Sequence, residues 1–314
     1  MTEIILHHYP QSPVAEKVRV VLGMKNLAWR SVQIPRLPPK PDLMPLTGGY
    51  RRTPVLQLGA DIYCDSQCII RELERRFPRP TLYPDGAAGL PWALSRWTDG
   101  ALFSAVVGVV IGAQADEVPM DFANDRGRLY FGPDFDWQEQ KRRLPHTLAQ
   151  IRAQFGWMEQ RLGAGREFML GAAPGLPDAL CYHLVWFFRG RYAGAATMLG
   201  EFPHLVAWEE RVAAIGHGHP RELDSKQALQ IARAATAQTR EQADPNDPQG
   251  LAPGQMVSVV PDVDGGDPVV EGRIVAVSAD GIALARSGDE VGDVVVHFPR
   301  VGYRVMPLEL NPLS

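Results

Sequence analysis

The chain has 314 residues, of which 45% are hydrophobic and 22% are charged. This composition is typical of a folded globular protein, and it excludes disordered, fibrous and small disulfide-rich proteins. The formal net charge of −4 excludes binding to nucleic acid or to an anionic membrane through bulk positive charge. At about 100–200 residues per domain, the length predicts two or three domains.

The chain contains three cysteines, Cys64, Cys68 and Cys181. Because this odd, sparse set suits neither a disulfide framework nor a zinc site, we predict reduced thiols and a cytoplasmic protein. The first residues, MTEIILHHYPQSP, lack the basic segment, apolar run and cleavage site of a signal peptide. The longest apolar stretch, 101–113, is shorter than the roughly 20 residues that span a bilayer, and it is predicted to be a buried helix.

The N-terminal part alternates between strand and helix signals. Apolar residues at helical spacing after Pro13 predict a helix, with Ser12 as its N-cap. A second helix is predicted at 66–77, whereas five prolines exclude regular structure within 35–45. A mixed sheet covered by helices accommodates this order. The apolar runs that predict strands are 3–7, 29–34, 54–58 and 61–64.

Helical periodicity dominates the middle of the chain, and strand signals return after it. Between these parts, residues 243–254 are rich in proline and glycine and are predicted to be a linker. The stretch 117–134 is predicted to be a loop. The predicted helices are 91–114, 136–162, 177–190, 202–216 and 224–241, and the predicted C-terminal strands are 256–260, 269–277, 282–286, 291–298 and 303–306.

Three domains follow from this pattern. Residues 1–84 are predicted to form an α/β domain, 91–242 an all-α bundle, and 255–314 a small all-β domain, a closed barrel of SH3-like kind. Residues 250–314 contain nine acidic residues and only four arginines, and this negative balance disfavours nucleic-acid binding. The C-terminal domain is open to interpretation as a docking surface, a dimer element, a lid or a structural appendage.

Ser12 is the first candidate for chemistry, because it lies where a predicted strand turns into a predicted helix. Its hydroxyl, the neighbouring N–H groups and the positive end of the helix dipole would stabilise a thiolate. A hydrogen bond to a charged partner contributes roughly 1.5–3 kcal/mol, which lowers a thiol pKa by about 1–2 units. Taken alone, the position favours an ordinary helix cap.

Two other segments could bind a ligand. Thr53-Pro54 taken alone favours a trans proline at the start of a strand, whereas a cis peptide would turn the backbone of Thr53 toward a ligand. Asp65-Ser66 opens a helix, and it is either an ordinary N-cap or a site in which Asp65 meets an ammonium group and Ser66 a carboxylate. The second alternative suits a ligand with both groups on one carbon.

The order and spacing of these segments resemble the thioredoxin-like N-terminal domain of cytosolic glutathione S-transferases. SPVAEKVRVVL, which begins at Ser12, is similar to the start of helix 1 in the serine- and cysteine-type classes, closest to the omega-like pattern C-P-x-A-E-[RK]-x-R. TPVLQ is similar to the family's cis-proline segment, and Asp65-Ser66 to its γ-glutamyl-binding turn. The helical stretch resembles the family's second domain, so the resemblance extends over about 240 residues.

The resemblance implies a transferase that uses glutathione as co-substrate, needs no metal and forms a homodimer. Ser12 would be the catalytic residue, through a hydrogen bond to the glutathione sulfur. Asp65 and Ser66 would hold the γ-glutamyl end, Thr53 beside Pro54 the cysteinyl unit, and Lys40 the glycyl carboxylate. The other substrate would be a small hydrophobic electrophile, and no nucleic acid or membrane is expected as a partner.

The sequence departs from the family's pattern at two points. His8 stands at the position of the tyrosine-type classes, with Tyr9 beside it. A serine at position 12 makes a stable mixed disulfide impossible, which favours conjugation, reductive cleavage or isomerisation over thiol transfer. The alternative function is a non-catalytic binding or scaffold protein that uses its C-terminal β-domain for protein interaction.

Several residues of the helical domain have either a functional or a structural interpretation. The electrophile pocket is predicted between the first two domains, although aromatic side chains at helical spacing equally fit a core. His183 is interpreted as a core histidine, and the segment from Gly175 to Asp178 as a structural capping box. The predicted pocket residues are Tyr9, Trp97, Phe103, Tyr182 and Trp186.

Overall fold

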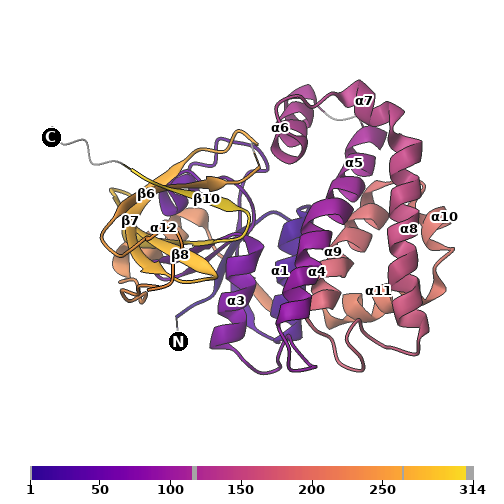
Figure 1. Cartoon of the computed structure of the whole chain (residues 1–314), viewed down its shortest axis with the longest axis horizontal. Helices are drawn as coiled ribbons and strands as arrows, with labels where there is room; N and C mark the ends of the chain where they lie inside the picture. Colours follow the sequence, from indigo (N-terminus) through magenta and orange to yellow (C-terminus); the bar gives the residue numbers. More distant parts are fainter. Residues whose placement is uncertain (1, 115–118, 264, 309–314) are drawn as a thin grey trace. The chain divides into compact units, whose positions relative to one another are not determined.

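The computed structural model describes residues 2–114, 119–263 and 265–308. These residues form two compact units, each with its own internal contacts (Figure 1). Two of the four boundaries between the units fall inside helices, α1 (Pro13–Met24) and α3 (Ser66–Arg76). The other two fall directly before β2 (Ala28–Gln33) and inside β5 (His219–Glu222). The first unit comprises the chain up to Ala15, Ala28–Leu73 and the chain from Pro220 onward, and the second comprises Glu16–Leu27 and Glu74–His219.

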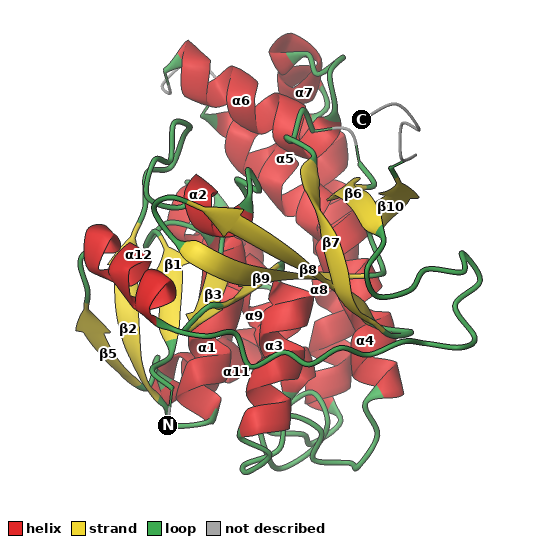
Figure 2. Cartoon of the chain, turned by 90° about the vertical axis from the view of Figure 1, so that its left-hand side faces the viewer, coloured by secondary structure: helices red, strands yellow, loops and turns green. Residues whose placement is uncertain are grey.

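In the described part of the chain, ten strands form one sheet, much of which is visible in Figure 2. The order across the sheet is β10-β6-β7-β8-β9-β4-β3-β1-β2-β5. The pairs β1–β2 and β4–β9 are parallel, and the other pairs whose register is known are antiparallel. The strands are β1 (Ile5–His8), β2 (Ala28–Gln33), β3 (Val55–Leu58), β4 (Asp61–Cys64), β5 (His219–Glu222), β6 (Met256–Pro261), β7 (Val270–Val277), β8 (Gly281–Gly288), β9 (Gly292–Pro299) and β10 (Tyr303–Pro307).

Every strand predicted from the sequence is present, with ends shifted by two residues or fewer. The additional strand β5 was missed. All four of its residues are exposed, so it carries no alternation of apolar and polar side chains. An edge strand of this kind is defined by its backbone pairing alone, which the sequence does not display.

The expected closed SH3-like barrel is not confirmed, because the C-terminal strands β6–β10 belong to an open sheet. They continue the N-terminal sheet through β9, in which Val296 lies opposite Ile62 of β4. This pairing satisfies the backbone groups of β4, which would otherwise be an open edge. Ile62, Val296 and Phe298 are buried in one hydrophobic cluster. The predicted linker 243–254 therefore connects α12 to strands of the same sheet and does not divide two separate sheets. The predicted domain boundaries stay predictions.

Helix α12 (Ser225–Ala234) lies beside the sheet in Figure 2 and contacts β9 and β2. The sequence predicts a helix that continues to residue 241, but it ends at Ala234. The residues after Ala234 leave the helix and reach β4, where Gln238 N and Thr239 Oγ1 donate to the Asp61 carboxylate over 2.6 and 2.5 Å. Asp61 is fully buried, and burying its carboxylate without hydrogen-bond partners would cost free energy, so these bonds stabilise the fold. A short additional helix, α2 (Met44–Thr47), lies in the proline-rich region.

The second unit is helical, as predicted, but two of its predicted segments differ from the structure, and the short helix α10 (Ala195–Leu199) was not predicted. The stretch 117–134 was predicted to be a loop, and from Met120 to Phe131 it is helix α6; residues 117–118 lie outside the described residues. The predicted helix 136–162 is two helices, which separate at Arg143 because Pro145 follows in the first turn of the second. The helices of this unit after α3 are α4 (Gly89–Trp97), α5 (Phe103–Ala113), α6 (Met120–Phe131), α7 (Trp137–Arg142), α8 (Leu144–Gly163), α9 (Leu176–Arg191), α10 (Ala195–Leu199) and α11 (Pro203–Ile215).

Gly127 explains why α6 was not predicted. Glycine lowers helix propensity and indicates a loop when only the sequence is considered. In the structure, a Cβ atom at this position would lie 2.0 Å from Cδ1 of Phe135. The glycine is therefore required by close packing of Phe135 against the helix.

Helices α4 and α5 are joined by a π-helical turn, η1 (Thr98–Leu102), into one helical stretch of 25 residues. By length and composition alone, this stretch could cross a membrane. However, α5 contacts α8 and α9, and its residues from Val106 to Gly112 are buried. This packing is that of a core helix, as predicted for 101–113.

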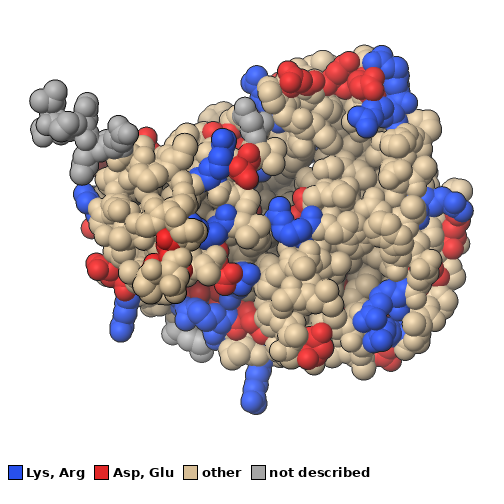
Figure 3. Space-filling model, viewed as in Figure 1, with Lys and Arg blue, Asp and Glu red and all other residues tan. Residues whose placement is uncertain are grey.

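Charges of both signs are interspersed over the face shown in Figure 3. Lysine and arginine side chains lie near aspartate and glutamate in each unit on that face. This distribution fits the small net charge of −4. Among the described residues, that face therefore shows no extended positive patch of the kind that binds nucleic acid or anionic lipid.

His7 in β1 predicts an acid-dependent loss of stability. It is fully buried, and its Nε2 atom lies 2.9 Å from Gln57 Oε1. Burial lowers the pKa of His7 to about 4, against about 6.5 in an unfolded chain. Between these values the unfolded chain binds a proton that the folded chain does not, so the free energy of unfolding should fall by about 3 kcal/mol as the pH falls through this window. Above it, the contribution of His7 is constant.

Urea unfolding between neutral pH and about pH 4 measures this slope. A His7→Gln variant keeps a hydrogen-bonding side chain without a titrating group, and it should lose that part of the slope. The matched control His146→Gln changes an exposed histidine and should keep it. Equal slopes in wild type and His7→Gln would contradict the prediction.

Candidate functional site

The strand register brings three of the predicted segments to one edge of the sheet. His7 in β1 lies opposite Val55 in β3, and Val55 lies opposite Cys64 in β4. The turn after β1, the segment before β3 and the turn after β4 therefore leave the sheet at the same edge. The predicted site residues on these segments are Ser12, then Thr53 and Pro54, and then Asp65 and Ser66.

Ser12 ends the turn that follows β1. Its N–H donates to Tyr9 O over 3.1 Å, and its Oγ accepts from Ala15 N over 3.1 Å, which confirms the predicted N-cap of α1. The side chain is buried, with 2% of its surface exposed. Its hydroxyl proton donates to no acceptor among the described residues. The helix therefore uses one acceptor position of the hydroxyl, and the O–H donor is left over.

The peptide bond between Thr53 and Pro54 is cis. The interpretation of an ordinary trans proline, which the pattern alone favoured, is therefore wrong, and the segment has the conformation that the family resemblance implied. Pro54 directly precedes β3, where its lack of an N–H costs no bond within the strand.

Lys40 lies against this segment although it is distant from it in sequence. Its ammonium group donates to Arg51 O over 2.8 Å and to Thr53 Oγ1 over 3.1 Å. The same group lies 6.0 Å from the centre of the Tyr9 ring. Lys40 thus connects the proline-rich region, the residue before the cis proline and the turn after β1, and 2% of its surface is exposed.

Asp65 adopts a left-handed backbone conformation, with φ of 75°. A non-glycine residue in this region costs free energy and often lies at a functional site. Its Oδ1 accepts from Gln67 N over 2.8 Å, and its backbone oxygen accepts from Ile69 N, so it caps α3. Ser66 is the first residue of α3 and is buried. The negative carboxylate and the positive helix end are thus adjacent.

The predicted pocket aromatics of the second unit contact different partners. Trp97 donates from Nε1 to Gln154 Oε1 over 2.7 Å, and Phe103 packs edge-on against Tyr130. The Arg19 guanidinium lies 6.0 Å from the centre of the Trp186 ring. Within the described residues, no ring contact joins Trp97, Phe103 and Trp186 to one another, so their role in a pocket stays a prediction. Tyr182 is buried and packs against Trp208.

The capping box and His183 are both in the core of the second unit. Gly175 N donates to Asp178 Oδ2 over 2.8 Å, so Asp178 reaches back to the helix start as predicted. His183 is fully buried, but neither ring nitrogen has a hydrogen-bond partner among the described residues. Burial lowers the pKa of His183 well below its usual range, which keeps the ring neutral.

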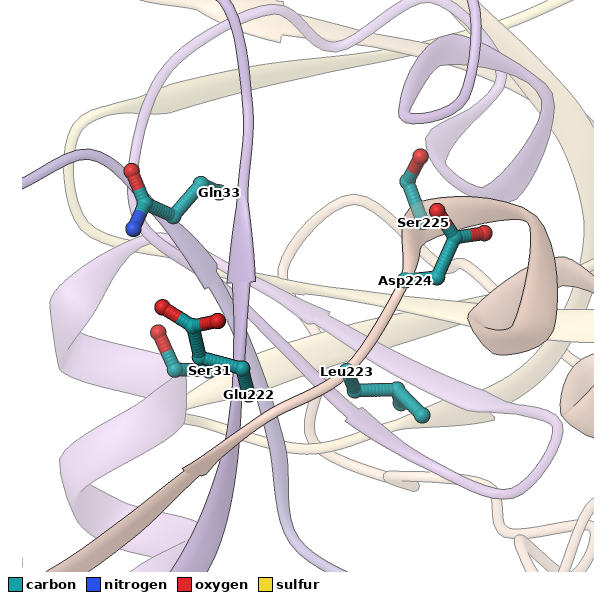
Figure 4. A pocket seen from close by; sticks show the side chains of 6 residues that line it. All are labelled: Ser31, Gln33, Glu222, Leu223, Asp224 and Ser225. Atoms are coloured by element: carbon teal, nitrogen blue, oxygen red, sulfur yellow. The ribbon is translucent and has the colours of Figure 1, made fainter.

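A hollow of about 410 Å³ lies where β2, β5 and the start of α12 meet (Figure 4). The side chains of Ser31 and Glu222 point to one side of it, and those of Asp224 and Ser225 to the other. None of the predicted site residues lines it. No three His, Cys, Asp or Glu side chains within residues 2–114, 119–263 and 265–308 are grouped to hold a metal ion. The lining residues are Ser31, Gln33, Glu222, Leu223, Asp224 and Ser225.

Comparison with known proteins identifies the family. Residues 6–81 match the family model for the glutathione S-transferase N-terminal domain, and residues 124–211 match that for the C-terminal domain. A solved GST-like protein from Pseudomonas syringae is 35% identical over 98% of this chain and 100% of that chain, with a TM-score of 0.81. The chain belongs to the glutathione S-transferase family.

Two more distant glutathione S-transferase structures share the fold. A Tau class enzyme from mango is 14% identical over 68% of this chain and 89% of that chain, with a TM-score of 0.52. A family member from Pseudomonas fluorescens, solved with two glutathione bound, is 15% identical over 68% of this chain and 89% of that chain, with a TM-score of 0.53. No curated protein sequence matches this chain.

Glutathione S-transferase membership accounts for the thioredoxin-like sheet and the helical domain. The contacts between the C-terminal strands and the site were not predicted from the sequence. Tyr303 in β10 lies 3.1 Å from Asp65 Oδ2, measured from its hydroxyl oxygen, and Arg52 pairs with Asp267 at 2.6 Å. Neither contact was predicted, because more than 200 residues separate the partners in each pair.

Proposed function

We propose that this protein is a serine-type glutathione transferase in which Ser12 stabilises the glutathione thiolate. The observation that carries the proposal is the divided role of the Ser12 hydroxyl. Its oxygen accepts from Ala15 N, while its proton has no acceptor among the described residues. A thiolate at the start of α1 would accept that proton as a hydrogen bond, and the helix dipole would add to the stabilisation.

The same sheet edge offers groups for the rest of the tripeptide. Asp65 would meet the α-ammonium group of the γ-glutamyl unit, and Ser66, at the start of α3, its carboxylate. The backbone of Thr53, beside the cis peptide, would pair with the cysteinyl unit. Lys40, whose ammonium group already contacts Thr53 Oγ1, would face the glycyl carboxylate. A protein of the same fold from Pseudomonas fluorescens was solved with two glutathione bound, which supports glutathione as the ligand class.

The reaction would be attack of the thiolate sulfur on a small hydrophobic electrophile. Placement of the two reactants and a lowered thiol pKa supply the rate enhancement, and no metal is required. Since a serine cannot form a mixed disulfide, conjugation, reductive cleavage or isomerisation is favoured over thiol transfer. Tyr9, Trp97, Phe103 and Trp186 remain the candidates to contact the electrophile.

We also propose a cytoplasmic homodimer. Cys64, Cys68 and Cys181 are free thiols, which fits the reducing compartment where glutathione is held in its thiol form. The homodimer rests on family membership, and size-exclusion chromatography with light scattering tests it.

Binding of reduced glutathione is expected to raise the thermal unfolding midpoint. A ligand at about 100 times its Kd stabilises the folded state by about 2.7 kcal/mol, which corresponds to a shift of roughly 4 °C for a chain of this size. The measurement is a thermal-shift titration of the full chain up to millimolar glutathione. Cysteinylglycine, which lacks the γ-glutamyl unit, should give a much smaller shift.

Asp65→Asn is the matched variant for this titration. Asparagine tolerates the left-handed conformation and keeps the side-chain shape, but it removes the charge that would meet the ammonium group. Its midpoint shift with glutathione should be reduced while the midpoint without ligand changes little. The absence of any shift in wild type would instead favour the non-catalytic scaffold protein.

A further inference from the structure

The C-terminal extension, defined here as residues 243–308, touches both ligand-binding segments of the site through direct contacts. At the turn after β4, the Tyr303 hydroxyl lies 3.1 Å from Asp65 Oδ2, and Gln67 Nε2 donates to Val301 O over 3.2 Å. At the segment before β3, Arg52 binds both carboxylate oxygens of Asp267. The proposed glutathione site is thus bordered by residues that the two family domains do not supply.

The Tyr303 side chain is held in place by other aromatic rings. Its ring centre lies 5.6 Å from that of Phe298 and 6.4 Å from that of Tyr50, and these two rings pack edge-on against each other. Its hydroxyl also lies 3.2 Å from the Tyr50 hydroxyl. Because an ionised carboxylate can only accept, the Tyr303 proton goes to Asp65 and the Tyr50 proton goes to Tyr303.

The two oxygens of Asp65 are therefore fixed by two different parts of the chain. Gln67 N binds Oδ1 over 2.8 Å, and Tyr303 binds Oδ2. These two bonds, one on each oxygen, set the orientation of the carboxylate. Burial and, second to it, the nearby Asp65 charge keep the pKa of Tyr303 well above its usual range, so the hydroxyl remains a donor at physiological pH.

We propose that Tyr303 is a positioning residue of the glutathione site, supplied by the C-terminal extension, which orients the Asp65 carboxylate toward the α-ammonium group of the γ-glutamyl unit. The inference rests on the proposed function. It gives the C-terminal extension a role in recognising the amine end of the tripeptide. Arg52 and Asp267, whose carboxylate is 1% exposed, secure the same extension beside the cis-proline segment.

The test compares Tyr303→Phe with wild type by calorimetric titration of the full chain with two ligands. Phenylalanine keeps the ring that packs on Phe298 and loses only the hydroxyl. For glutathione, the Kd should rise about five- to tenfold, as expected for the loss of one hydrogen bond. For desamino-glutathione, which lacks the α-ammonium group, the Kd should change by less than about twofold. Turnover should show a raised KM for glutathione and a nearly unchanged kcat.

Two further variants distinguish a positioning role of Tyr303 from a nonspecific disturbance of the site's structure. Asp65→Asn should discriminate between the ligands as Tyr303→Phe does, and the double variant should bind glutathione no more weakly than Asp65→Asn alone. Ser287→Ala, which removes an exposed hydroxyl bond to Asp293 in the same extension, should behave as wild type. If wild type does not bind glutathione, the proposed function fails. If wild type binds but Tyr303→Phe affects neither ligand, or both equally, the positioning role is overturned.

Discussion

Replacing Ser12 by alanine is expected to lower turnover with glutathione and a model electrophile by about 10–100-fold. A hydrogen bond from a neutral donor to a charged acceptor contributes roughly 1.5–3 kcal/mol, and each 1.36 kcal/mol corresponds to about a tenfold change in rate. The thiol pKa of bound glutathione should rise by about 1–2 units in the variant. The acid limb of the pH–rate profile should therefore move to higher pH by the same amount.

A control is needed because Ser12 also caps α1 through Ala15 N. The alanine variant should lose about 1 kcal/mol of stability with the cap. Ser12→Asp keeps an acceptor for Ala15 N but cannot donate to a thiolate and repels it. It should keep the cap of α1 and be at least as inactive as Ser12→Ala. Wild-type turnover in Ser12→Ala, with an unmoved pH profile, would remove Ser12 from the mechanism.

Replacing Asp178 by alanine is expected to lower the free energy of unfolding by about 3–5 kcal/mol, because it leaves buried donors without partners. Asp178 is fully buried and accepts three hydrogen bonds, from Met169 N over 2.9 Å, Gly175 N over 2.8 Å and Trp208 Nε1 over 2.7 Å. This loss is a large part of the about 5–15 kcal/mol that stabilises a typical protein.

Asp136→Ala is the matched control, since Asp136 is also a helix N-cap, accepting from Gln138 N over 2.8 Å, but is exposed. It should cost about 1 kcal/mol, because water satisfies the freed N–H group. Urea unfolding of both variants gives the comparison. Similar losses in the two variants would show that the three buried bonds of Asp178 do not determine its effect.

The parts of the site that could be predicted from the sequence depend on local chemistry. Ser12 before Pro13 and a run of apolar residues at helical spacing is sufficient to place an N-cap, and the structure confirms it. Asp65 before Ser66 likewise predicts the start of α3. In each case the partner atoms lie within four residues, so the pattern is contained in a short window.

The errors arose where a contact with residues outside the predicted element outweighs the local signal. Gly127 indicates a loop when only its neighbours in sequence are considered, but it lies in helix α6 and packs against the ring of Phe135. The helical signal after Ala234 is overridden because Gln238 and Thr239 bind the buried Asp61 carboxylate. The C-terminal strands have the alternation of a small barrel, but β9 pairs with β4 and leaves the sheet open.

The amino-acid sequence by itself determined the order of strands and helices, the caps of α1 and α3, and the family resemblance, because each depends on residues that are close along the chain. Only the tertiary structure decided which segments share an edge of the sheet and which residues meet across it. The contacts of Lys40 with Thr53 and of Tyr303 with Asp65 join positions that are 13 and 238 residues apart. Such contacts depend on strand register and side-chain packing, and no local pattern of residues specifies them.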